Sequence, residues 1–152
     1  METPTTTTAP SSGTGRRPTS EGSDRVRRVF SGAPWEPAYG YCRAVRDGDR
    51  IWVSGTAAVG PDGKVVAPGD LQTQTQRCIE IVADALAELG AGLADVRRTR
   101  VFVTDIARWE EVARAHREAF GANPPAATMV EVSRLIDPDM LVEIEVDATV
   151  PR

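Results

Sequence analysis

The sequence is poor in the residues that build metal and thiol sites. It contains one histidine and two cysteines in 152 residues, and neither Cys42 nor Cys78 belongs to a CxxC pair or a histidine-rich stretch. Zinc-binding motifs require such spacings. We therefore expect no metal site, and we interpret both cysteines as reduced thiols that pack against neighbouring side chains.

Long apolar runs and clustered positive charge are also missing. No segment approaches the roughly 20 apolar residues that a membrane span requires, and the N-terminus carries no apolar signal core. A formal net charge of −4 argues against a nucleic-acid partner, because phosphate binding depends on concentrated Lys and Arg. We expect a cytoplasmic protein that binds neither membranes nor nucleic acids.

The signature motifs of several enzyme classes are absent as well. The sequence holds no GxSxG elbow, phosphate-binding glycine loop, HExxH pair or kinase signature. Serine-triad hydrolysis and nucleotide chemistry therefore lose their usual sequence evidence.

The composition fits a single folded domain behind a polar tail. A chain of 152 residues with 41% hydrophobic and 26% charged residues has room for one core. Residues 1–24 are mostly Thr, Ser, Pro and Gly, which bury too little apolar surface to offset the entropy of ordering. We predict a disordered tail over residues 1–24 and one domain over residues 25–152.

The first half of this domain predicts a hairpin followed by a helix. Residues 45–53 form two strand-like runs joined by the Asp47-Gly48 turn signal. Further on, Asp70 is a suitable N-cap, and apolar residues recur at helical spacing up to Leu89. Gly90 supplies the stop signal for this helix.

The second half predicts a strand, a second helix and two more strands. The strand candidates are residues 96–104, 128–132 and 140–150, with Val65-Val66 as a possible short addition. Asp105 caps the second helix, whose predicted apolar stripe is Ile106, Trp109, Val112, Ala113, His116 and Phe120. The predicted fold is α+β, with two helices on one face of a mixed β-sheet. The other face then needs a cover, which predicts oligomerisation.

The last predicted strand carries an unusual row of acids. Glu143, Glu145 and Asp147 alternate on the side opposite its apolar residues. Unless water or arginines screen these charges, at least one carboxyl group should have a raised pKa and could serve as a general acid or base. The alternative is an exposed strand face surrounded by arginines.

Three other residues invite a functional interpretation. His116 lies on the apolar stripe of its helix, so we interpret it as a hydrogen-bonded helix-face histidine rather than a proton carrier. Cys42 has no evident base or cation to activate it, which favours packing over nucleophilic catalysis. We assign Trp35 to a subunit interface, because large aromatic side chains favour such surfaces.

Several segments together resemble the RidA/YjgF family in order and spacing. They are Tyr41, Ile51-Trp52-Val53-Ser54-Gly55, the helix 72–90, Val101-Phe102-Val103-Thr104-Asp105, Pro125-Ala126, Val130-Glu131-Val132 and Val142-Glu143-Ile144-Glu145. The resemblance covers about residues 30 to 150. It implies a homotrimer of chorismate-mutase-like subunits with clefts at the subunit interfaces. It also implies hydrolysis of reactive enamines and imines to a keto acid and ammonia, without a metal or organic cofactor.

The resemblance also implies the residues of the site. Tyr41, Ser54 and Glu143 match family site positions, where the glutamate would position or protonate the attacking water or the leaving ammonia. Gly55, at the end of the hairpin, is expected to present its backbone to the ligand.

The anion-binding part of the family site differs in this chain. The family arginine that follows Pro-Ala and holds the substrate carboxylate is replaced by Ala127, and Met129 occupies a position that is often cysteine. The lost charge-assisted contact is worth about 1.5–3 kcal/mol, so we expect weak activity on ordinary 2-imino acids. Arg134 and Arg43 are the candidates to replace this arginine.

Three interpretations remain open, of which a purely structural role is the least favoured, because the acidic strand would then have no evident reason to face a cleft. The first, slightly favoured, is a cofactor-independent, deaminase-type hydrolase that acts on an imine, an enamine or a related small molecule. The alternative is a non-catalytic trimer that binds a metabolite and has a regulatory or protein-partner role.

Overall fold

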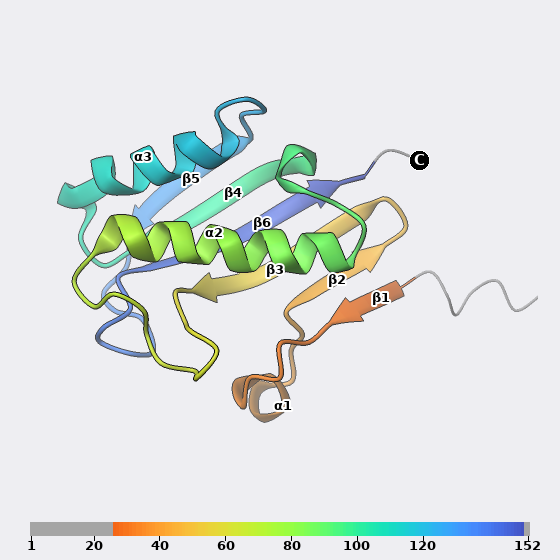
Figure 1. The fold of residues 1–152 in the computed structure, drawn as a ribbon, viewed down its shortest axis with the longest axis horizontal. Coiled ribbons are helices and arrows are strands. Elements are labelled where there is room, and N and C mark those ends of the chain that lie inside the picture. The colour runs from red at the N-terminus through yellow and green to blue at the C-terminus, as the bar shows by residue number, and fades with distance from the viewer. Residues whose placement is uncertain (1–25, 151–152) are drawn as a thin grey trace, which may run out of the picture.

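A computed structural model describes residues 26–150, which form a sheet of six strands in the order β1-β2-β3-β6-β4-β5 (Figure 1). The strands are β1 (Val26–Val29), β2 (Ala44–Asp47), β3 (Arg50–Ala57), β4 (Val96–Val103), β5 (Ala126–Glu131) and β6 (Val142–Thr149). Neighbouring strands are antiparallel except for the parallel pair β4 and β5, so the predicted mixed sheet is confirmed. The tail predicted over residues 1–24 lies outside the described residues.

Two long helices cover one face of the sheet, as the sequence predicted. They are α2 (Leu71–Glu88) and α3 (Trp109–Phe120), which lie side by side in front of the sheet in Figure 1. A short helix, α1 (Trp35–Tyr39), lies between β1 and β2 in the chain, and two 3-10 turns, η1 (Leu93–Asp95) and η2 (Ile106–Arg108), precede β4 and α3. None of the helices within residues 26–150 is both long and apolar enough to cross a bilayer.

The expected turn and cap residues act as predicted. Gly48 has a positive φ of 63° in the β2–β3 turn, and Gly90 has a φ of 78° just after α2. The Asp70 side chain accepts a hydrogen bond from the Thr73 backbone N–H at 2.9 Å, which caps α2. Local sequence signals therefore set both ends of this helix.

Other elements differ from the sequence prediction. Strand β1 was not predicted, because Val-Arg-Arg-Val is too short to show a period-2 pattern. Val65 forms only an isolated bridge with Val59. Asp105 caps the turn η2 rather than α3, and this extra turn rotates Ile106 and Trp109 away from the buried stripe, so that they are 39% and 51% exposed.

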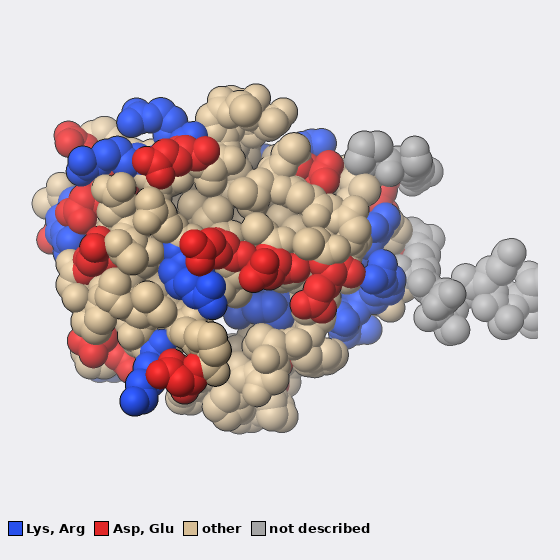
Figure 2. Space-filling model, viewed as in Figure 1, with Lys and Arg blue, Asp and Glu red and all other residues tan. Residues whose placement is uncertain are grey.

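The core lies between the two long helices and the sheet. Its buried side chains include Val82 and Leu86 from α2 and Ile51, Val101 and Ile144 from the strands. The solvent side of α2 is acidic, because Glu80, Asp84 and Glu88 are exposed one turn apart (Figure 2). Within residues 26–150, neither long helix covers the opposite face of the sheet, and Trp52 on that face is 41% exposed.

Candidate functional site

A β-bulge in β3 is the centre of the candidate site. The pairing of β3 with β6 shifts register between Val53 and Thr56, so the bulge contains Ser54 and Gly55. The Ser54 hydroxyl donates to the Cys42 carbonyl at 2.8 Å, and the Thr56 hydroxyl donates to the Ser54 carbonyl at 2.8 Å. The sequence predicts Ser54 and Gly55 at the end of the hairpin, whereas they lie within β3, which continues to Ala57.

The carboxyl group of Glu143 lies directly against this bulge. Glu143 pairs with Ala57 in β3 and with Phe102 in β4, and its side chain points away from the helix-covered face. A Cβ atom at position 55 would overlap a carboxylate oxygen of Glu143. Gly55 is therefore required for the close approach of strand backbone and acid, a reason that the sequence did not reveal.

The environment of Glu143 suits proton transfer. Burial raises the pKa of this carboxyl group, the charge of Glu145 raises it further, and the positive charge of Arg43 partly opposes the shift. The group consequently keeps its proton to a higher pH than an exposed glutamate does. A carboxyl group in this state can donate a proton and then accept one.

Arg43 braces the bulge from the β2 side. Its Nη2 atom donates to the Ser54 carbonyl at 2.6 Å and to the Gly55 carbonyl at 2.5 Å. Burial lowers the pKa of this guanidinium, although the nearby Tyr41, Glu36 and Glu143 oppose the shift. Because these backbone contacts engage Arg43, it is a poor replacement for the missing substrate arginine.

Tyr41 reaches the site from the loop that follows α1. Its backbone N–H donates to the Glu36 carbonyl at 3.1 Å, and its ring meets that of Tyr39 edge to face at 6.0 Å. Arg43, two residues after Tyr41, contacts the bulge carbonyls of Ser54 and Gly55. The structure thus brings together Ser54, Gly55 and Glu143 and places Tyr41 in the loop that leads into the same strand pair.

Glu36 organises this loop, a role that no sequence pattern predicted. Its side chain is 3% exposed and accepts hydrogen bonds from the N–H and hydroxyl of Ser31 and from the N–H of Gly32. Burial would raise the pKa of Glu36, but these hydrogen bonds outweigh burial and hold the pKa below its ordinary value. A serine five residues before a lone acid in a Gly-Ala-Pro loop was the only available signal.

The two alternatives predicted for the acidic strand, a carboxyl group with a raised pKa and acids screened by arginine, both occur in it. Arg100 lies 3.4 Å from Glu145 and 3.2 Å from Asp147, so an arginine screens two of the three acids. Glu143 lies outside this ion-pair group and has the raised pKa. The row of acids is therefore divided between charge pairing and a candidate acid-base function.

The structure does not bring the remaining predicted residues to Glu143 within one chain. Ala127 and Met129 pair with Thr99 and Val101, which are buried on the helix-covered face, so both point to the face opposite Glu143. Two strand spacings, about 10 Å, also separate β5 from β6. Arg134 is exposed in the loop between these strands and makes no ion pair with another described residue.

The histidine and the thiols have structural surroundings. His116 Nε2 lies 2.9 Å from the Thr99 hydroxyl, and burial lowers the pKa of the imidazole, which confirms a hydrogen-bonded helix-face histidine. Both cysteines are free thiols, and burial raises the pKa of Cys78 to about 12. Within residues 26–150, no three His, Cys, Asp or Glu side chains gather to hold a metal ion.

The protein is a small α+β domain with a carboxylate site. It has a mixed sheet, two helices that cover one face of the sheet, and a half-buried acid at a strand bulge.

Residues 31–150 match the family model described as Endoribonuclease L-PSP. The chain is 41% identical to an uncharacterized protein of Streptomyces coelicolor over 83% of its length and 93% of that protein. It is 34% identical to a RutC family protein of Pyrococcus abyssi, over 77% of its length and 91% of the relative.

A solved structure supports the same relationship. The crystal structure of Rv2704 from Mycobacterium tuberculosis, a member of the YjgF/YER057c/UK114 family, matches with a TM-score of 0.75 and 46% identity. The match covers 82% of this chain and 99% of that one. The chain therefore belongs to the RidA/YjgF family.

Proposed function

We propose that this protein is a cofactor-independent hydrolase that converts an imine or enamine to a carbonyl compound and ammonia. The observation that carries the proposal is the position of Glu143, a half-buried carboxyl group with a raised pKa that lies against the backbone of Gly55. The family resemblance supplies the reaction type, and the site supplies a group suited to it.

In the proposed reaction, water adds to the carbon of the C=N bond. Protonated Glu143 donates its proton to the imine nitrogen, and the resulting carboxylate accepts a proton from the attacking water. A second transfer then protonates the amine and removes the hydroxyl proton, so that the C–N bond breaks and ammonia leaves. The Tyr41 hydroxyl is proposed to orient the water, and Glu143 ends the cycle protonated.

We propose that the complete site lies between subunits of a homotrimer. The uncovered sheet face carries Glu143, whereas Ala127 and Met129 lie on the other face of the same chain. A neighbouring subunit would therefore have to supply the family substrate-binding position. Ala127 in that position weakens the binding of a 2-imino acid by about ten- to a hundredfold.

RNA cleavage, which the family description names, is not our proposal. The only histidine, His116, is hydrogen-bonded to Thr99 under a helix, and the chain has a net charge of −4. Neither feature favours binding or cleaving a polyanion.

The proposal is tested by ammonia release from freshly generated 2-iminobutyrate and 2-aminoacrylate, corrected for spontaneous hydrolysis. Wild type should release ammonia faster than buffer alone, and Glu143→Gln should lose about a hundredfold or more of that rate. Asp147→Asn is the matched control, because the carboxylate of Asp147 lies on the same strand and pairs with Arg100. Equal rates for wild type and Glu143→Gln would rule out the acid-base role.

Ala127→Arg separates the two candidate functions. The alanine itself favours the second candidate, a trimer that binds a metabolite without turnover. An active wild type that Ala127→Arg accelerates on 2-imino acids supports a hydrolase with a different preferred substrate. An inactive wild type that Ala127→Arg activates supports the binding function.

A further inference from the structure

Arg43 and Glu143 approach the same glycine of the bulge. The Nη2 atom of Arg43 donates to the Ser54 carbonyl at 2.6 Å and to the Gly55 carbonyl at 2.5 Å. The Glu143 carboxylate occupies the space in which a side chain on Gly55 would begin. A guanidinium and an acid are thus both fixed against one short stretch of strand, so the bulge must change if either group moves.

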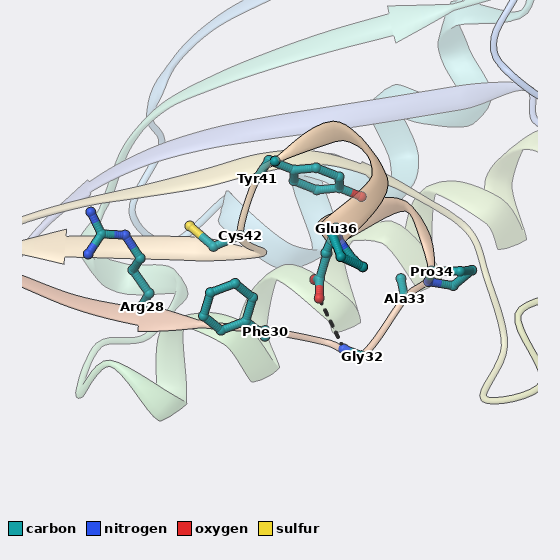
Figure 3. A pocket seen from close by; sticks show the side chains of 10 residues that line it. Arg28, Phe30, Gly32, Ala33, Pro34, Glu36, Tyr41 and Cys42 are labelled. Atoms are coloured by element: carbon teal, nitrogen blue, oxygen red, sulfur yellow. Dashed lines mark hydrogen bonds between the residues drawn. The ribbon is translucent and has the colours of Figure 1, made fainter.

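The permanent countercharge of Arg43 is Glu36 rather than Glu143. Burial would raise the pKa of Glu36, but hydrogen bonds from its own loop and the charge of Arg43 hold that pKa below its ordinary value. Figure 3 shows the Glu36 carboxyl group turned toward Gly32, whose backbone N–H donates to it at 3.1 Å. Glu36 therefore stays ionised and balances Arg43, which leaves Glu143 free to exist with or without its proton.

The Nε atom of Arg43 shows that this guanidinium is not placed for stability alone. It is buried and has no hydrogen-bond partner among the described residues. A buried donor without an acceptor lowers stability, and folded proteins mostly avoid it. A side-chain conformation that brought Nε to water would withdraw Nη2 from the two bulge carbonyls. Such exceptions to good packing are expected at functional sites.

Few other charges act on Glu143. Its pairing partners in β3 and β4 are uncharged. Burial and the charge of Glu145 on the same strand both raise the pKa of Glu143, and Arg43 is the cation that opposes them. The Cys78 thiol on α2 also lies within the field of Glu143, but its pKa of about 12 keeps it neutral.

We propose that Arg43 is a positioning residue, a fixed cation that holds the bulge in shape and determines whether Glu143 carries a proton when the substrate binds. This inference rests on the proposed function, in which protonated Glu143 donates to the imine nitrogen and the carboxylate then accepts a proton from water. Without Arg43, the acid would keep its proton to a higher pH and would return less readily to the carboxylate form.

A titration of the Glu143 carboxyl group tests the inference in the full-length protein without turnover. The glutamate side chains are labelled with ¹³C, and the Glu143 signal is assigned by its absence in Glu143→Gln. In Arg43→Gln, which replaces the cation by a neutral amide, the titration midpoint should move upward by about one pH unit. Arg43→Lys should keep the wild-type midpoint, because one nitrogen makes both bonds to the bulge and an ammonium group can replace it.

Arg46→Gln is the matched control for the loss of a half-buried arginine. Arg46 lies in β2 and also donates to two backbone carbonyls, at 2.6 and 2.8 Å. Its substitution should lower stability and leave the titration of Glu143 unchanged. Arg43→Met is a second neutral variant in case Arg43→Gln does not fold, and the fully buried Cys78 thiol, which should resist alkylation in a folded protein, reports folding.

The pH profile of ammonia release connects the titration to the proposed reaction. Because the protonated acid starts the reaction, the wild-type rate should fall as pH rises through the pKa of Glu143, and Arg43→Gln should move this fall upward with the titration midpoint. An unchanged midpoint in Arg43→Gln, an equal shift in Arg46→Gln, or equal shifts in Arg43→Lys and Arg43→Gln would each overturn the inference. A protein that releases no ammonia would overturn the hydrolase proposal alone, since the carboxyl titration still decides the role of Arg43.

Discussion

The side-chain oxygen of Gln74 accepts a hydrogen bond from the Leu141 backbone N–H at 2.9 Å, and its amide nitrogen donates to the Asp139 carbonyl at 2.8 Å. Gln74 is fully buried in α2, and Leu141 immediately precedes β6. One helix side chain thus fixes the start of the strand that carries Glu143.

Gln74→Leu should destabilise the protein substantially. The substitution leaves the half-buried Leu141 N–H and the Asp139 carbonyl without their side-chain partner, which costs about 1–3 kcal/mol of unfolding free energy. Urea denaturation measures the effect. Gln76→Leu, which loses only a 3.4 Å contact with Glu118, should change stability by less than about 0.5 kcal/mol.

Gly55→Ala should disturb the candidate site. The added methyl group overlaps the Glu143 carboxylate, so either the acid or the bulge must move, at a cost of about 1–3 kcal/mol. Ammonia release should fall together with stability. Gly92→Ala is the control, because its φ is −143° and a Cβ there meets nothing within 4 Å. A Gly55→Ala protein with wild-type stability and rate would contradict the described contact.

Glu143 should give stability an unusual pH dependence. Its pKa in the folded protein is raised above the ordinary value of 4.5, so the folded state binds this proton more tightly than the unfolded state. The contribution of Glu143 is fully present below pH 4.5 and is lost as pH rises through the folded-state pKa.

Glu143→Gln removes this titration, so the comparison between variant and wild type isolates it. Relative to wild type, the variant should become progressively more stable as pH rises from about 4 to 7, as measured by urea unfolding at each pH. Asp147→Asn serves as the control, because Asp147 pairs with Arg100 on the same strand. A stability difference that does not change with pH would show that the carboxyl group titrates normally.

A substitution of Trp52 tests the proposed trimer. It is 41% exposed on the sheet face that carries no helix, next to Asp147 in β6. If that face is the subunit interface, Trp52→Glu should convert a trimer to a monomer in light scattering, because a buried unpaired charge beside an acid is unfavourable. Trp109→Glu, at a 51% exposed position on α3, should leave the trimer intact.

The parts of the fold with strong local signals were predictable. Asp70 and Gly90 bound α2, and the Asp47-Gly48 turn joins β2 to β3, because caps and turns depend on a few adjacent residues. The 3-10 turn η2 was not predictable, since helix periodicity alone does not distinguish a tight first turn from an α-helical one. It displaced Trp109 from the predicted core.

The candidate site, like the fold, was only partly predictable from the sequence. Glu143 stood out because three acids alternate on one strand, and Tyr41 and Ser54 came from the family resemblance. The contacts that position them are of two kinds. Arg43 reaches the Gly55 carbonyl on the neighbouring strand, a contact that exists only once the strands pair. Glu36 closes a loop through Ser31 and Gly32, four to five residues earlier, with no regular spacing that would predict it.

The two edges of the sheet differ, and this difference limits how copies can join. Strand β1 has four residues, two of them the exposed Arg27 and Arg28, whereas β5 has six residues and one acid, Glu131. Short, charged edges resist pairing with another strand. A filament grown by strand addition needs two compatible edges on every copy, but the sheet formed by residues 26–150 offers one, at β5. Backbone pairing between copies should therefore end at two molecules, which protects the protein against fibrous aggregation.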